Sequence, residues 1–207
     1  MKDLIARILC SAAQAMWRKE PTLGKYTSET AEYELNLAFH YAAELRNWFP
    51  FLDCDFDVTK PNFNRERPDI ILHRRGSDLN FLVVEVKRER FREAVLADLQ
   101  QIRERWFRGN LRYRYGAAAI LDEDGCGFEA QVLSREQPEQ ESSTLSLADM
   151  SSPLQVSTRV RRSVALSDLE REIENLLYTL YGLRAEEIQI FEDASNRHGG
   201  TAEGGAR

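Results

Sequence analysis

The sequence predicts an α/β protein in which helices flank a mixed β-sheet. Apolar residues at helical spacing predict three helices, over residues 3–18, 28–48 and 91–106. Short apolar or alternating runs predict five strands, over residues 53–59, 69–73, 80–87, 115–121 and 128–133. Helices and strands in this order favour layers of helix packed on a sheet. The chain has 207 residues, 43% of them hydrophobic, which is enough for a buried core.

The expected helices have recognisable ends and apolar faces. Pro21 and Gly24 are expected to end the first helix. Ser28 is an expected N-cap for the second, where Glu34 suits the positive end of the helix dipole, and Pro50 closes that helix. The third helix repeats its apolar residues at spacings of four, three and four: Val95, Leu99, Ile102 and Trp106.

The expected strands differ in how they are buried. Asp53–Thr59 alternates charged and apolar residues, which indicates one wet face. Asp69–His73 and Asn80–Lys87 are separated by Arg-Arg-Gly-Ser-Asp, a turn composition, so we expect them to be neighbours. Tyr115–Leu121 is a buried strand by its apolar content, and Phe128–Leu133 is its expected hairpin partner.

Composition divides the chain into four parts. We predict a core with an N-terminal helix, a polar linker or long loop, a C-terminal helical segment and a disordered Gly-rich tail, over residues 1–133, 134–160, 161–194 and 195–207. The helical segment has a leucine-rich face over 168–181, and Gly182 suits its C′ position. This segment would form a helical appendage to the core.

Several classes of protein are excluded by composition. A membrane-spanning helix needs about 20 apolar residues, and the apolar runs here are far shorter. The charged N-terminus lacks the apolar stretch of a secretory signal. Cys10, Cys54 and Cys126 are widely spaced without a CxxC pair, which disfavours a disulfide framework and a thiolate zinc site. We therefore expect a cytoplasmic protein without a membrane partner.

The charge is unevenly distributed along the chain. The net charge is −6, yet residues 60–114 hold 14 Lys and Arg against 8 Asp and Glu, a net +6. The rest of the chain holds 14 basic and 26 acidic residues. A basic middle within an acidic protein is compatible with a nucleic-acid partner, although arginine-rich surfaces are often simply solvated.

Two charged residues interrupt the apolar run of the strand over 80–87. Glu85 and Lys87 point to the same face of that strand, because a two-residue step restores the side-chain direction. Asp69 follows Pro68 at the start of the preceding strand, so a short turn can bring it beside Glu85. Two carboxylates and the backbone carbonyl of Val86 are hard oxygen ligands that suit Mg²⁺ or Mn²⁺. A lysine on the same face can orient or deprotonate a nearby water.

These residues resemble the motif of the PD-(D/E)XK nuclease superfamily. The stretches Arg-Pro-Asp-Ile-Ile-Leu-His-Arg-Arg-Gly from Arg67 and Asn-Phe-Leu-Val-Val-Glu-Val-Lys from Asn80 are similar to small bacterial members with the pattern RPDIIxHxRG and NxLVxEVK. The resemblance covers residues 28–121 and implies a restriction-endonuclease-like core. It also implies a Mg²⁺-dependent endonuclease, with Asp69, Glu85 and Val86 at the metal and Lys87 as the catalytic lysine.

The superfamily also places a glutamate on the helix before the sheet. On a helical wheel, Glu34 falls within about 60° of the expected core-facing residues Leu37, Ala38, Tyr41, Leu45 and Trp48. Glu34 is therefore our fourth candidate catalytic residue. Its alternative role is a first-turn carboxylate favoured by the helix dipole.

Arginines around the motif are candidates for nucleic-acid contacts, because guanidinium groups bind phosphates in a bidentate manner. Some superfamily members use a glutamine on the helix after the lysine, and Gln101 is the candidate here. The candidate nucleic-acid-binding residues are Arg67, Arg74, Arg75, Arg88 and Gln101. DNA is the expected substrate.

The C-terminal segment from Leu177 resembles a short LYxLYGLxxEEIxxxE stretch of some restriction-modification proteins. It implies a restriction or defence setting, and its helix could join a homodimer or dock on a protein partner. The alternative function is a catalytically silent nucleic-acid-binding protein or an accessory subunit of a restriction-type complex.

Overall fold

The computed structural model describes residues 1–28, 33–57, 67–122, 124, 126–150, 178–179 and 182–190. The chain forms two compact units. Lys2–Gln155 forms the larger, and the other comprises Met1 and Val156–Arg207. Our predictions for the tail over 195–207 and for most of the helix over 168–181 lie outside the described residues. In the smaller unit residues 178–179 and 185–190 are helical.

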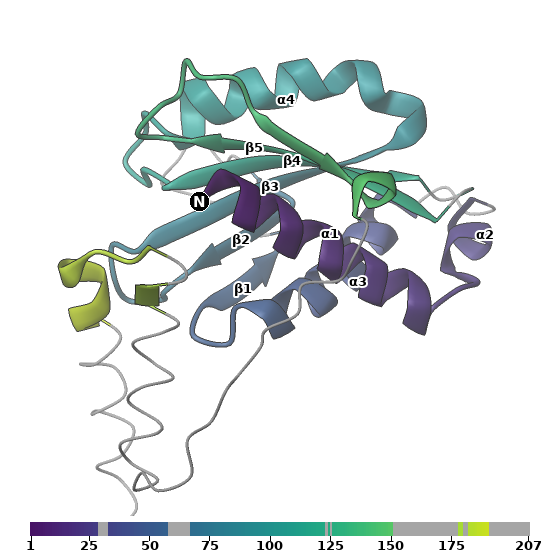
Figure 1. Ribbon diagram of the computed structural model, residues 1–207, viewed down its shortest axis with the longest axis horizontal. Helices are drawn as coiled ribbons and strands as arrows, with labels where there is room; N and C mark the ends of the chain where they lie inside the picture. The colour runs from purple at the N-terminus through teal and green to yellow at the C-terminus, as the bar shows by residue number, and fades with distance from the viewer. Residues whose placement is uncertain are drawn as a thin grey trace, which may run out of the picture. The chain divides into compact units, whose positions relative to one another are not determined.

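The larger unit is built on one six-stranded mixed sheet, in the order β1-β2-β3-β4-β5-β6 (Figure 1). The β3–β4 pair is parallel and the other neighbours are antiparallel. The strands are β1 (Asp53–Phe56), β2 (Ile70–His73), β3 (Asn80–Arg88), β4 (Tyr115–Asp122), β5 (Gly127–Ser134) and β6 (Ser143–Ser146). The prediction of an α/β protein with a mixed sheet flanked by helices is confirmed.

A helical crossover connects the parallel strands β3 and β4, as parallel pairing requires. It consists of a 3₁₀ segment η2 (Glu89–Ala94), α4 (Val95–Gln101) and a π-helical segment η3 (Ile102–Trp106). Its apolar side packs on the sheet in one cluster with Ile71, Val83, Ile120 and Leu133. The four residues predicted from periodicity, Val95, Leu99, Ile102 and Trp106, are all buried in this cluster.

The N-terminal helices cover the other side of the sheet (Figure 1). They are α1 (Lys2–Lys19), α2 (Leu23–Ser28), α3 (Tyr33–Leu45) and the 3₁₀ segment η1 (Arg46–Trp48). The first helix ends at Lys19, before Pro21, as predicted, but Gly24 lies inside α2. The predicted N-cap is wrong, because Ser28 ends α2 instead of capping the next helix. No helix among the described residues is long and apolar enough to cross a bilayer.

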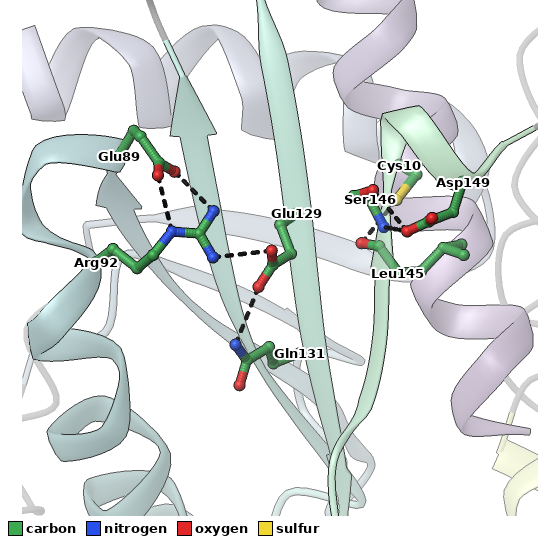
Figure 2. A network of polar contacts seen from close by, with 8 residues as sticks. All are labelled: Cys10, Glu89, Arg92, Glu129, Gln131, Leu145, Ser146 and Asp149. Atoms are coloured by element: carbon green, nitrogen blue, oxygen red, sulfur yellow. Dashed lines mark hydrogen bonds and ion pairs between the residues drawn. The ribbon is translucent and has the colours of Figure 1, made fainter.

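The predicted linker over 134–160 contains a strand, so this part of the prediction is wrong for Ser143–Ser146. This strand, β6, pairs with β5 at the sheet edge, and α1 supports it through a Cys10 thiol that donates to the Leu145 carbonyl. Ser146 and Asp149 then form a capping box for a 3₁₀ turn, η4 (Leu147–Asp149), as Figure 2 shows. Few apolar residues mark this strand, because it is half-exposed at an edge.

Gly116 on β4 lies where Ile102 and Phe107 pack tightly on the sheet. A Cβ atom built at Gly116 would overlap the Ile102 side chain and lie 3.3 Å from the Phe107 ring. We expect Gly116→Ala to lower the free energy of unfolding by about 1–3 kcal/mol, as overpacked cores do. Chemical denaturation would measure this change.

The matched control is Gly127→Ala on β5. There a new Cβ would lie 3.1 Å from the Asp122 carboxylate oxygen and 3.2 Å from the Asp122 Cβ, contacts that a shift of a few tenths of an ångström relieves. We expect this substitution to change stability far less. Equal stabilities of the two variants would contradict the tight packing of η3 on β4.

Candidate active site

The antiparallel register of β2 and β3 brings the predicted acidic residues together. Ile70 pairs with Val84, so Asp69, directly before β2, lies beside the Glu85–Val86 peptide. The Val86 amide donates a hydrogen bond of 2.6 Å to Asp69 Oδ2. The Asp57 amide donates to the Asp69 carbonyl at 2.8 Å, which holds the backbone entering β2. The predicted neighbourhood of Asp69 and Glu85 is therefore present in the structure.

Lys87 lies between carboxylates contributed by two helices. Its Nζ is 3.7 Å from Glu34 Oε1 on α3 and 3.6 Å from Asp98 Oδ2 on α4. The same ammonium donates to the Val86 carbonyl at 3.2 Å. The amine thus has three acceptors around it, and its side chain is 20% exposed. Glu34 therefore contacts the predicted catalytic lysine. The sequence alone leaves two roles open for Glu34, a site residue or a first-turn carboxylate favoured by the helix dipole.

Glu85 is the most buried carboxylate of this group, with 7% of its surface exposed. The indole Nε1–H of Trp106 donates to its Oε1 at 3.0 Å. Trp106 itself is fully buried in the crossover cluster, so the rigid core fixes the orientation of Glu85. A carboxylate held in this way is pre-organised on a strand rather than on a loop.

Burial and mutual repulsion change the proton affinities of the cluster. Burial, together with the charge of Asp69, raises the pKa of Glu85 to about 8. Burial also raises the pKa of Asp69 and the pKa of Asp98. Partial burial would lower the pKa of Lys87, but the charges of Asp98 and Glu34 outweigh it and raise that pKa. One cation therefore faces four carboxyl groups in a poorly solvated place.

The donor set of this cluster fits a hard divalent cation. Asp69 uses Oδ2 for the Val86 amide and Glu85 uses Oε1 for Trp106. Asp69 Oδ1 and Glu85 Oε2 accept no hydrogen bond from the described residues, so each carboxylate keeps one oxygen available. Among the described residues, no group of three His, Cys, Asp or Glu side chains is arranged to hold a metal. The predicted metal site has only two such side chains, Asp69 and Glu85, and takes its third ligand from the backbone carbonyl of Val86.

The predicted nucleic-acid contacts have different surroundings. Arg67 pairs with Asp57, and Arg75 pairs with Asp53 and Asp55. Arg74 and Gln101 are partly exposed. Arg88 is 3% exposed, and its guanidinium carbon lies 6.0 Å from the centre of the Phe91 ring. Burial of Arg88 does not fit the phosphate contact predicted for it, because β3 continues through Arg88 and turns its side chain inward.

A polar network holds the chain that follows Lys87. Arg92 on η2 donates two hydrogen bonds of 2.8 Å to Glu89, and its Nη1 donates to Glu129 on β5, also at 2.8 Å. Gln131 donates to the other oxygen of Glu129, at 3.0 Å (Figure 2). The first turn of the crossover is thereby attached to the sheet within a few residues of Lys87.

Sequence reasoning missed Asp98 and Trp106 as parts of the site. Residue type favours Gln101 on α4, but Asp98 is the α4 side chain that contacts Lys87. The signal that could have identified Asp98 is its position on the helical wheel. Asp98 lies about 60° from the core residue Val95, whereas Gln101 lies about 120° from it. The criterion that selects Glu34, a position within about 60° of core-facing residues, therefore also selects Asp98.

Comparison of the chain with protein-family models, curated proteins and solved structures finds no match. The function must therefore be inferred from the residues of the cluster and their geometry.

Proposed function

We propose that this protein is a Mg²⁺-dependent endonuclease of the PD-(D/E)XK type that hydrolyses phosphodiester bonds in DNA. The observation that carries the proposal is the convergence of Glu34, Asp69, Glu85 and Lys87, from three separate elements, around one point of the sheet. Their order along the chain and their place on the sheet support a restriction-endonuclease-like core.

Asp69, Glu85 and the Val86 carbonyl would hold the metal ion. Bound Mg²⁺ would supply positive charge to the phosphate oxygens as negative charge develops there. Burial raises the pKa of both Asp69 and Glu85, and the charge of Asp69 raises the pKa of Glu85 further. Ionising both carboxyl groups is therefore costly without a cation, which supports this use of the pair.

Lys87 would orient the attacking water and donate a hydrogen bond to it. Glu34 and Asp98 hold the ammonium from opposite helices, so the lysine enters the reaction already positioned. Because these carboxylates raise the pKa of Lys87, the amine stays protonated at neutral pH. The protonated form supports positioning and charge stabilisation rather than proton abstraction by the lysine itself.

DNA is the proposed substrate because of the basic character of residues 60–114. Several exposed arginines of this segment lie on the crossover and on the chain that leads to β4. Among them are Arg90, Arg105, Arg108 and Arg112. These side chains lie at the surface, where backbone phosphates can approach them, whereas Arg88 is buried.

The test is cleavage of supercoiled plasmid, double-stranded and single-stranded DNA oligonucleotides, and RNA, with Mg²⁺ or Mn²⁺ and with EDTA. We expect metal-dependent cleavage of DNA by the wild type and none by Asp69→Asn. The asparagine side chain would keep an oxygen for the Val86 amide, so this variant isolates the carboxylate charge. Absence of cleavage across the whole panel would contradict the proposal and favour the silent or accessory function.

A further inference from the structure

A polar pocket lies at the end of the β1–β2 pair that is farther from Asp69. Its volume is about 460 Å³, within the range of ligand pockets. The pocket forms because Asp53 pairs with His73, so the chain that enters β1 runs beside the turn that leaves β2. Arg46 lines it from η1, and Arg74 and Arg75 line it from the turn after β2.

The charges that line this pocket do not cancel. Arg75 is neutralised, because it forms ion pairs with Asp53 and Asp55. Asp53 is the acidic residue of the lining, and its Oδ2 also accepts the Arg75 amide at 2.8 Å. Within the described residues, Arg46 and Arg74 form no ion pair with a carboxylate. Three arginines, Arg46, Arg74 and Arg75, therefore stand against the two carboxylates of Asp53 and Asp55, which leaves an excess of one positive charge at this pocket.

The framework of the pocket is fixed before any ligand arrives. The turn that carries the arginines is closed by the Arg74 amide on the Leu79 carbonyl at 2.9 Å and by Ser77 Oγ on the Arg74 carbonyl at 2.9 Å. Gly76 has a φ of 76°, which this turn requires and which side-chain-bearing residues rarely adopt. Cys54 also lines the pocket, and its thiol donates to the Ala42 carbonyl at 3.7 Å.

The geometry points to a binding site for a phosphate group in this pocket, held by Arg46 and Arg74. Guanidinium groups bind phosphate oxygens through paired N–H donors, and two of them match the charge of a phosphate. The Cys54 thiol adds no negative charge to the pocket, since burial raises its pKa to about 11. The bound species is either a free phosphate or nucleotide, or a backbone phosphate of a nucleic acid.

This site is separate from the cluster around Lys87. Asp53 and His73 pair at one end of the β1–β2 ladder, and Phe56 and Ile70 pair at the other end, next to Asp69. Three strand steps of about 3.3 Å put the two ends roughly 10 Å apart. A single phosphate cannot touch both places. The inference also does not rest on nuclease activity, because phosphate binding is measured without cleavage.

The experiment is thermal unfolding of the full chain in EDTA, with inorganic phosphate added at constant ionic strength against sodium chloride. EDTA removes divalent ions that could carry phosphate to Asp69. We expect a saturable rise in melting temperature for the wild type. In Arg46→Gln and in Arg74→Gln, about tenfold more phosphate should be needed for the same rise, since each variant loses one charge-assisted contact. Arg18→Gln, on α1, removes one exposed cation and should behave as the wild type.

Two further titrations distinguish the sources of the phosphate. If the natural ligand is free, a nucleoside monophosphate should lose affinity in Arg74→Gln while a short DNA oligonucleotide does not. If a nucleic-acid backbone occupies the pocket, the oligonucleotide should lose affinity as well, with a weaker salt dependence. The inference is overturned if phosphate stabilises the wild type no more than chloride does. It is also overturned if Arg46→Gln and Arg74→Gln respond to phosphate as the wild type does.

Discussion

Lys87→Met is expected to reduce metal-dependent DNA cleavage by about 10²–10⁴-fold, the usual contribution of a positioned proton donor or acceptor. The ammonium lies at the centre of the cluster, 3.7 Å from Glu34 and 3.6 Å from Asp98. A methionine fills similar space but donates no hydrogen bond to a water or a phosphate oxygen. DNA affinity, measured with Ca²⁺ by fluorescence anisotropy, should change little because the surface arginines remain.

The matched control is Lys19→Met. Lys19, at the end of α1, also forms an ion pair with a carboxylate at 2.7 Å, but its partner Glu44 lies at the other end of α3 from Glu34. This variant should cleave DNA as the wild type does. If Lys87→Met retains wild-type cleavage, the lysine has a structural role and the proposed mechanism is incorrect. Loss of cleavage together with loss of DNA affinity would assign Lys87 to substrate binding instead.

Glu85→Gln is expected to make the metal-free protein more stable at pH 8 while it abolishes cleavage. The folded state raises the pKa of Glu85 from 4.5 to about 8, so the folded protein holds a proton that the unfolded chain releases. Stability therefore falls as the pH rises from about 4.5, and the loss is complete above about 8. Glutamine carries no charge, and its side-chain oxygen can still accept the Trp106 N–H. The gain at pH 8 is on the order of 3–5 kcal/mol.

Denaturant unfolding in EDTA at pH 5 and pH 8 measures this gain. The wild type should lose stability between the two values, and Glu85→Gln should lose much less. Glu44→Gln serves as the control, because Glu44 is a 15% exposed carboxylate whose loss breaks its pair with Lys19. It should not stabilise the protein at pH 8. With Mg²⁺ added, the wild type should gain stability and Glu85→Gln should not. A destabilised Glu85→Gln at pH 8 would mean that the carboxylate is a structural partner of Lys87.

The sheet up to β5 could be predicted because its strands are marked by apolar runs and turns. β6 could not, because Ser-Thr-Leu-Ser carries one apolar residue and its pairing depends on β5 and on α1. The short helix α2 is missed for a related reason, since Pro21 and Gly24 suggest a loop. The composition of a short segment does not reveal that a distant strand or helix stabilises it through tertiary contacts.

More of the candidate site than of the surrounding surface could be predicted from the sequence. Glu34, Glu85 and Lys87 interrupt apolar faces, and a charge on such a face is visible in the sequence. Asp98 satisfies the same criterion, but it is missed when residue type is given more weight than helical position. The sequence prediction ends the strand at Lys87, one residue early, and therefore places Arg88 outside it. β3 continues through Arg88, which lies on the same face as Val84 and Val86 and is buried as they are.

The packing of α1 constrains how the chain folds during synthesis. α1 contacts β5 and β6, and Lys2 bonds to the carbonyl of Glu141, 139 residues later. At about 5–20 residues per second, roughly seven to thirty seconds separate synthesis of Lys2 from synthesis of that partner. Over this interval α3 can cover only part of the apolar face of α1, which includes Ile5, Leu9 and Met16. Nascent chains that stall before β5 would expose this face, and they are the forms most prone to aggregate or to engage chaperones.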